Sequence, residues 1–417
     1  MRDLMVFGMV CMLLPMALRH GYAAYLLWGW TAQLVPTIYV YGFMESFRFN
    51  FVFAIIAIGM LLLGRVSDKG TYKPTPTMVL LIAFFAHMSV CAALAFEPNP
   101  INYTIWENFA KSFTFVMLMP LFVSGRLRLH GMLLMIALGL GFHGTVEGLK
   151  VIASGGGHHP EGLLANILSD NNHFAVGMAV SLPIHYYLYQ YSEKKLARLG
   201  FLTALILTAV TILGTNSRGG FLSMAVVGLW MVMTSRYKFR GLFWVAVAAA
   251  AIYNFAPASW VERVDTIQTA GSDGSFMGRV AAWKVSSAIA IGNPVFGGGL
   301  HAVQQWWIVQ IYENAPSLLG MIEVPPLLYA AAAHSIYFEV LGDTGFVGLF
   351  LFLGLLINGL ATRVQVVRLT RRHGTQMLWA RDMADLLAVA LAAYMVGGAA
   401  VSLAYFCLLY TSPSPRD

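Results

Sequence analysis

The chain has 417 residues, of which 58% are hydrophobic and only 11% are charged, and its mean hydropathy is +0.69. Soluble domains carry about 25% charged residues, so this composition excludes a water-soluble globular protein and indicates an integral membrane protein. The net charge of +7 comes mainly from short loops between apolar stretches. That distribution indicates membrane topology rather than a nucleic-acid partner.

The first segment, residues 1–18, begins with Met1-Arg2-Asp3 and continues as a short apolar run, as a signal peptide does. It lacks a small-residue cleavage site and leads into more apolar sequence, so we expect it to be retained. Its length leaves open whether it spans alone or forms a hairpin with the next segment. The three cysteines lie in apolar runs without metal-ligand spacing, so neither a disulfide framework nor a zinc site is predicted.

Eleven further stretches have a length and apolar character that fit, or nearly fit, a membrane-spanning helix. They lie at 22–40, 49–64, 77–95, 108–124, 131–149, 173–190, 201–214, 221–235, 241–255, 342–361 and 384–411. The predicted fold is therefore an all-α polytopic membrane protein with about 11–12 transmembrane helices.

Lysine and arginine residues set the predicted orientation, because they gather in alternate loops. These basic loops are 65–76, 125–130, 191–200, 236–240 and 362–382. Basic loops face the cytoplasm, so the intervening loops face outward. The outward loops are 96–107, 150–172, 214–220 and the long 256–333.

The loop 256–333 divides the chain into 1–255, the loop itself, and 334–410. It contains Trp260, Trp283, Trp306 and Trp307 but few charges, and amphipathic aromatic residues favour the membrane interface. We expect short helices lying over the outer face. Residues 411–417 form a polar tail after an apolar run and are interpreted as a truncated or non-native end, in which case Gly397-Gly398 marks a break between two final spans.

The outward loop 214–220 reads Gly-Thr-Asn-Ser-Arg-Gly-Gly, and Arg218 is its only charge. A guanidinium offers a fixed fork of donors that suits phosphate oxygens, and the small neighbours would leave room for a ligand. The alternative is an interfacial arginine that reaches lipid headgroups.

A second outward arginine, Arg279, lies in Gly278–Trp283, upstream of the turn-rich segment 292–300. This segment is no P-loop, because no Gly-Lys-Ser/Thr follows it. Two arginines near one site could hold a diphosphate. Taken alone, Arg279 fits a ligand contact and a structural ion pair equally well.

Residues 334–349 place a histidine, a tyrosine and two carboxylates where the long loop re-enters the membrane. Such groups are costly near hydrocarbon, so this junction is the first place to expect chemistry. His334 is the best candidate base, because its ordinary pKa of about 6.5 allows it to accept a proton at neutral pH. Tyr337 would share a helix face with His334 if the helix has begun there. A histidine bonded to the backbone at the start of a helix is the alternative.

Ser169–Ala175 opens another helix from the outer side, and an N-cap with a polar first turn explains it sufficiently. A role for Asn172 or His173 in orienting substrate is the second interpretation. The adjacent His158 and His159 lack a visible partner set, so no metal is predicted there.

Four segments in this order resemble the O-antigen ligase and polymerase superfamily of bacterial inner-membrane proteins. They are 170–175, 215–221, 279–299 and 334–349. The opening residues 1–4 and 14–19 resemble the subgroup described as exosortase-associated O-glycosylation ligases. The resemblance extends to about residue 410.

The resemblance implies a GT-C-like, multi-pass inner-membrane enzyme with its active site facing the periplasm. It would transfer a glycan from undecaprenyl diphosphate to an acceptor hydroxyl, such as that of lipid A core, with inversion and without a metal or other cofactor. Arg218 and Arg279 would bind the diphosphate, and His334 would activate the hydroxyl. Further substrate contacts are expected from Asn172, His173, Ser217, Trp283 and Tyr337.

Other functions compete with this one. A polymerase or a protein O-oligosaccharyltransferase of the same fold would differ only in its acceptor. A polysaccharide flippase or transporter would show internal repeats and ionisable residues at mid-span, and neither pattern stands out here.

Overall fold

The computed structural model describes the chain except for residues 68, 98, 164–167, 235–238, 240–273 and 406–417. The described residues form thirteen α-helices and three 3-10 helices, and no strand occurs among them. The α-helices are α1 (Arg2–Arg19), α2 (Gly21–Leu34), α3 (Phe49–Leu62), α4 (Pro76–Ala93), α5 (Pro100–Phe122), α6 (Gly125–Ala153), α7 (Asn171–Tyr191), α8 (Lys195–Gly214), α9 (Arg218–Thr234), α12 (Gly274–Gly292), α13 (Trp306–Tyr312), α14 (Ile336–Thr370) and α15 (Leu378–Gly398). The 3-10 helices are η1 (Pro36–Tyr39), η2 (Ala302–Gln304) and η3 (Arg371–Met377).

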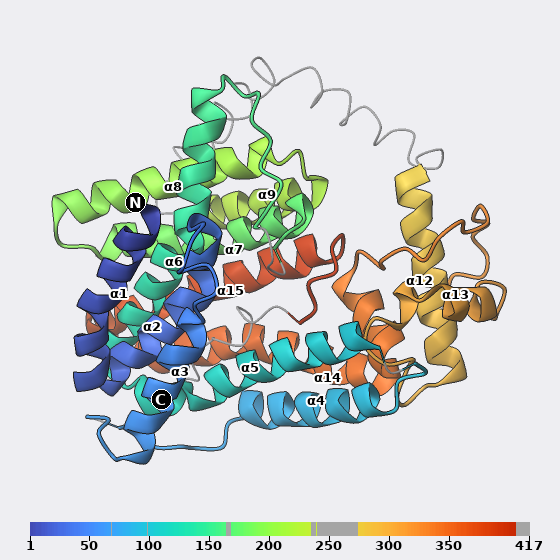
Figure 1. Ribbon diagram of the computed structural model, residues 1–417, viewed down its shortest axis with the longest axis horizontal. Helices are drawn as coiled ribbons and strands as arrows, with labels where there is room; N and C mark the ends of the chain where they lie inside the picture. The colour runs from blue at the N-terminus through green and yellow to red at the C-terminus, as the bar shows by residue number, and fades with distance from the viewer. Residues whose placement is uncertain (68, 98, 164–167, 235–238, 240–273, 406–417) are drawn as a thin grey trace.

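The helices form an elongated body, with α1–α3 at one end and α12 and α13 at the other (Figure 1). Four described helices, α4, α6, α8 and α14, are long and apolar enough to cross a membrane, and α3 and α9 are shorter apolar helices. Apolar side chains such as Phe350 and Ile357 of α14 are exposed, as lipid-facing residues would be. The predicted class of all-α polytopic membrane protein is confirmed. The predicted span 241–255 and Trp260 lie outside the described residues.

Local sequence explains where several helices begin. The Thr75 hydroxyl accepts a hydrogen bond from Met78 N at 3.3 Å, and the Asn99 side chain accepts one from Asn102 N at 2.9 Å. A proline follows each cap at the first helical position, where its missing N–H costs nothing. Helix α15 ends at Gly398, at the glycine pair where a break was expected. The second span expected beyond it would extend into residues 406–417, which lie outside the described residues.

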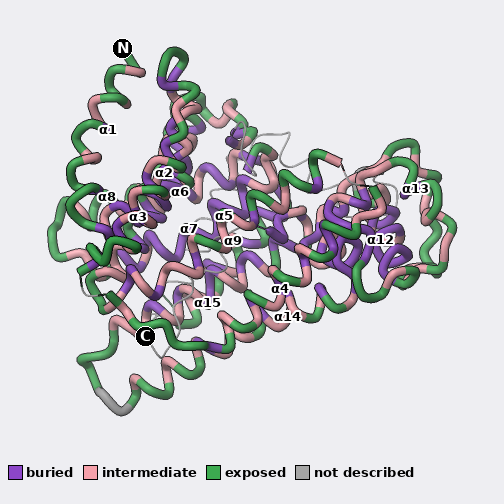
Figure 2. The backbone as a smooth tube through the Cα atoms, turned by 60° about the horizontal axis from the view of Figure 1, so that its bottom comes forward, coloured by how far each residue is buried: buried purple, intermediate pink, exposed green. Residues whose placement is uncertain are grey.

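Helix α7 lies at the centre of the packing, because it contacts α6, α8, α9 and α15. Its residues 174–185 are all buried. They join side chains of α4, α14 and α15 in the largest apolar cluster. Figure 2 shows buried positions along the middle of the body and around α12, whereas α1 is largely exposed. The first turn of α7 therefore leads directly into the buried core.

Helix α14 is longer than the predicted span 342–361 and kinks at Gly345, which has φ 67° and ψ −168°. The glycine-rich segment 293–300 fits against this kink. Gly298 N donates to Gly342 O at 2.9 Å, and Phe346 N donates to Pro294 O at 2.8 Å. Broken helices are tolerated at membrane depth where other protein groups satisfy the backbone in this way. The segment 292–300, which was interpreted only as turn-rich, therefore supplies hydrogen bonds to backbone groups at the kink of α14.

The described part of loop 256–333 carries α12, η2 and α13. Helix α12 has 19 residues, so it is longer than the short helices expected there. It forms a separate small apolar cluster with η2 and α13. Trp306 and Trp307 are about two-fifths exposed (41% and 39%), and Trp307 Nε1 donates to the Glu97 carboxylate.

Candidate active site

Two helix starts meet at the loop between α8 and α9. Ser217 Oγ accepts a hydrogen bond from Gly220 N at 3.2 Å and so caps α9. The same hydroxyl donates to Asn172 Oδ1 at 2.9 Å. Asn172 lies in the first turn of α7, where the Asp170 carboxylate accepts from Asn172 N and His173 N at 2.9 and 3.2 Å. These bonds place Arg218, which is exposed at the start of α9, beside the start of α7.

The glycines after Arg218 do not provide space for a ligand, so that interpretation is wrong. Gly219 and Gly220 are both buried. A Cβ atom on Gly219 would lie 3.3 Å from Ala400 Cβ, and one on Gly220 would overlap Ala175 of α7. Small residues of this kind let membrane helices approach closely. The pair therefore packs α9 against α7 and the end of α15.

His334 lies just before α14, with the left-handed φ of 44° that non-glycine residues rarely adopt. Its N–H donates to Ser402 Oγ at 3.0 Å. The preceding carbonyl, Ala333 O, accepts from Trp283 Nε1 at 2.6 Å. Contacts from α12 and from the segment after α15 therefore hold this unusual backbone. A shared helix face with Tyr337 required a helix that had begun at His334, and this condition is not met, because α14 begins only at Ile336.

The imidazole of His334 is arranged to stay neutral. Its Nδ1 atom is buried and has no hydrogen-bond partner among the described residues. Burial lowers the pKa of His334, the charges of Arg279 and His173 lower it further, and the Asp170 carboxylate opposes them by raising it. A neutral imidazole keeps a lone pair that can accept a proton.

Those electrostatic neighbours come from two helices. Arg279 is supplied by α12, whereas Asp170 and His173 come from the start of α7. His334 thus has Arg279 and His173 as charged neighbours from two other segments of the chain. Arg218 is not among the charges that shift the His334 pKa. It follows Ser217, whose hydroxyl binds Asn172, the residue before His173.

Two predicted substrate contacts have structural partners. The Trp283 ring stacks on Phe338 with centroids 5.1 Å apart, and its Nε1 binds Ala333 O. Tyr337 OH donates to Met395 O at 2.9 Å. These bonds attach α12 and α15 to the start of α14, so they position His334.

The two carboxylates of α14 hold the segment that follows α15. Glu339 Oε2 accepts from Ala404 N at 3.0 Å, and Asp343 Oδ2 accepts from Tyr405 OH at 2.9 Å. Ser402 is thereby fixed against His334. No sequence signal pointed to Ser402, a small residue in an apolar run. Asp170 lay within the segment 169–175, which was interpreted first as a helix cap.

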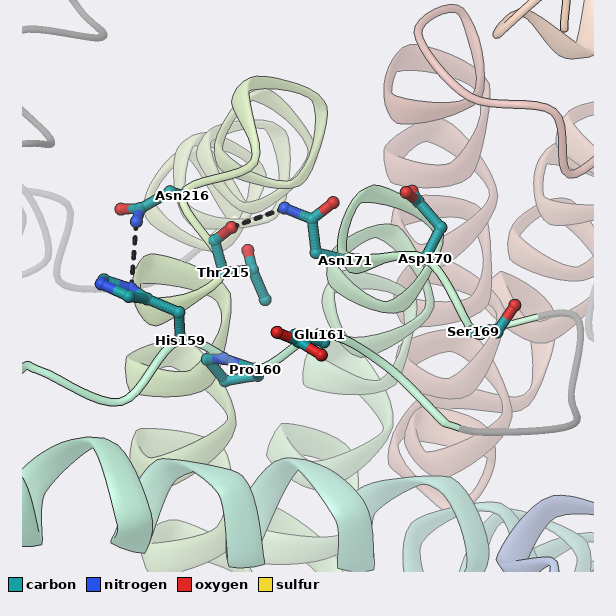
Figure 3. A pocket seen from close by; sticks show the side chains of 8 residues that line it. All are labelled: His159, Pro160, Glu161, Ser169, Asp170, Asn171, Thr215 and Asn216. Carbon is teal, nitrogen blue, oxygen red and sulfur yellow. Dashed lines mark hydrogen bonds between the residues drawn. The ribbon is translucent and has the colours of Figure 1, made fainter.

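An open pocket of about 440 Å³ adjoins this group (Figure 3). It is lined by His159, Pro160, Glu161, Ser169, Asp170, Asn171, Thr215 and Asn216. Asn171 Nδ2 donates to Thr215 O at 3.0 Å, and Asn216 Nδ2 lies 3.1 Å from His159 Nδ1. The turns that form the pocket are thus the ones that carry Asn172 and Arg218.

The fold and the site together define a multi-pass membrane protein with a polar, charged centre where loops meet helix starts. Residues 203–353 match the family model described as O-Antigen ligase, and this match supports the expected resemblance to the O-antigen ligase superfamily. Residues 1–193 match a family of unknown function, DUF5935. No curated protein matches the chain. Arg218, Arg279 and His334 all lie within the O-antigen ligase match, which supports a glycosyltransferase-like activity.

Proposed function

We propose that the protein is an O-antigen ligase-type glycosyltransferase of the bacterial inner membrane. It transfers a glycan from undecaprenyl diphosphate to a hydroxyl group of lipid A core on the periplasmic face. The observation that carries this proposal is the buried Nδ1 of His334, which has no hydrogen-bond partner among the described residues and lies near the Arg279 charge. A proton acceptor next to a fixed cation suits a reaction that deprotonates a hydroxyl and expels a diphosphate.

The proposed reaction is a single displacement at the anomeric carbon. The acceptor hydroxyl oxygen forms the new glycosidic bond while the bond from the anomeric carbon to the diphosphate oxygen breaks. Undecaprenyl diphosphate leaves with that electron pair, and His334 takes the hydroxyl proton before releasing it to solvent. Attack from the side opposite the leaving group inverts the anomeric configuration.

Arg279 and Arg218 supply the charge stabilisation. Guanidinium groups bind phosphate oxygens bidentately and stay charged at any physiological pH. Fixed cations aimed at a leaving group act without reorganising during the reaction, and this is commonly the largest contribution to catalysis. The reaction is therefore expected to proceed without a divalent cation.

The test gives the full-length protein, in lipid nanodiscs with EDTA, an undecaprenyl-diphosphate glycan together with lipid A core. Products are identified by mass spectrometry. The proposal predicts glycan joined to lipid A core from wild type and from the control His20→Gln, which alters an exposed histidine between α1 and α2. Lengthening of the donor without a lipid A product would contradict the ligase assignment and indicate a polymerase. If neither product forms, the ligase assignment is replaced by transfer to a protein acceptor or by a transport function.

A further inference from the structure

We propose that the pocket between residues 159–161, 169–171 and 215–216 is a saccharide-binding subsite for a sugar without acidic groups. This inference deepens the proposed function and rests on it for the role of the bound sugar. The volume of about 440 Å³ falls within the ~300–1,000 Å³ of typical small-molecule sites. The pocket is therefore large enough for a small saccharide.

The lining groups have the chemistry that sugar hydroxyl groups need. The Glu161 and Asp170 carboxylates are acceptors, the amides of Asn171 and Asn216 offer both donors and acceptors, and the Ser169 hydroxyl can do either. A sugar hydroxyl is itself both donor and acceptor, so it can use all of these groups. In Figure 3 Glu161 lies below Asn171, with the His159–Asn216 pair on one side and Asp170 and Ser169 on the other.

The charge of the lining selects among possible ligands. Of the residues that the structure describes, two carboxylates and neither lysine nor arginine line the pocket. A phosphate or a uronic acid would meet like charges there, which is unfavourable. The diphosphate of a donor would therefore lie on the Arg218 and Arg279 side, with an uncharged sugar in the pocket.

The position of the pocket links it to transfer. Asp170 both lines the pocket and acts electrostatically on His334. Thr215 and Asn216 line it three and two positions before Arg218, respectively. A sugar held here would lie beside the candidate transfer centre, where it belongs either to the donor glycan or to the acceptor.

Binding can be measured without transfer, by saturation-transfer NMR on the full-length protein in nanodiscs with EDTA. The neutral probes are N,N′-diacetylchitobiose, cellobiose and lactose, and the acidic probe is digalacturonate. We expect at least one neutral disaccharide to bind more tightly than digalacturonate. Glu161→Ala and Asn216→Gly should weaken that binding by about 2- to 10-fold, the equivalent of one lost hydrogen bond. Glycine retains the left-handed backbone of Asn216, which has φ 55°.

The matched control is Glu193→Ala, which removes an exposed carboxylate from the loop between α7 and α8. It should bind as wild type does, and all variants should unfold at similar temperatures. Three results would overturn the proposal. They are disaccharide binding that neither Glu161→Ala nor Asn216→Gly weakens, an affinity for digalacturonate equal to that for the neutral probes, and no binding of any neutral probe. Saccharide binding that depends on Glu161 in a protein without transfer activity would refute the proposed function and leave the subsite standing.

Transfer kinetics then distinguish the two sources of the sugar. A KM raised by Glu161→Ala for the undecaprenyl-diphosphate glycan assigns the pocket to the donor. A KM raised for lipid A core assigns it to the acceptor. Unchanged KM values for both substrates would contradict a subsite that serves the reaction.

Discussion

Replacing Gly345 with alanine should disrupt the kink of α14 that lies just beyond His334. A Cβ atom there would lie 2.7 Å from Pro294 O and 3.0 Å from Asn293 O. Even close carbon–oxygen contacts are about 3.3–3.6 Å, so the backbone of the glycine-rich segment would have to withdraw by about half an ångström or more. Its bond from Phe346 N to Pro294 O, now 2.8 Å, would be strained or lost.

The magnitude follows from two costs. The conformation at φ 67° and ψ −168° is essentially restricted to glycine, and strain of this kind costs about 1–3 kcal/mol. Forcing an extra methyl group against backbone atoms costs about 1–3 kcal/mol more. The sum, about 2–6 kcal/mol, is a large share of the ~5–15 kcal/mol that stabilises a typical protein. Gly345→Ala should therefore unfold at a clearly lower temperature and lose transfer activity.

Gly354→Ala is the matched control, because it makes the same change later in α14. Its Cβ atom would lie 3.5 Å from Leu80 Cδ2, which is ordinary contact, and its φ is not positive. Thermal unfolding in detergent, followed by tryptophan fluorescence, compares the two variants. If both variants unfold at the same temperature, the reasoning about the kink is refuted.

Further predictions concern the groups that hold and tune His334. Ser402→Ala should lower kcat about 10-fold or more with little change in KM, because a small misplacement of a reacting group costs up to ~100-fold; an unchanged kcat would remove the positioning role. Arg279→Gln should weaken transfer. It should also move the limb of the pH–rate profile on which the rate rises with pH to higher pH, since losing this cation raises the His334 pKa. Asp170→Asn, which can still cap α7, should move it to lower pH; a shift of either profile in the opposite direction would contradict the assigned electrostatics. Trp283→Phe keeps an aromatic ring but loses the hydrogen bond from Nε1 to the carbonyl before His334, so its kcat should fall while protein yield is maintained. Wild-type kinetics for this variant would show that the hydrogen bond is dispensable.

The sequence predicted the class of fold and singled out candidate site residues, for a clear physical reason. Burying so much apolar sequence requires a membrane, and charged groups on outward loops are few. Arg279 and His334 could therefore be singled out, and in the structure Arg279 and His173 are charged neighbours of His334. Their proposed roles in transfer stay predictions.

What the sequence did not predict depends on packing between distant segments. Gly219 and Gly220 were interpreted as leaving room for a ligand, but glycines serve close helix packing equally well. Only the position of α7 decides between these two roles. The helix start at Ile336 was missed because the left-handed backbone of His334 is imposed by tertiary contacts. The contact of Ser402 with His334 and the pocket could not be predicted for the same reason.

The most direct test of the account compares wild type with His334→Ala in single-turnover transfer from undecaprenyl-diphosphate glycan to lipid A core. Donor binding to each protein is measured separately. The account predicts that the variant still inserts in the membrane and binds the donor, while glycan–lipid A core formation falls by at least the ~100-fold typical of a lost general base. Product formation at the wild-type rate by a well-folded His334→Ala protein would contradict the assignment of His334 as the base.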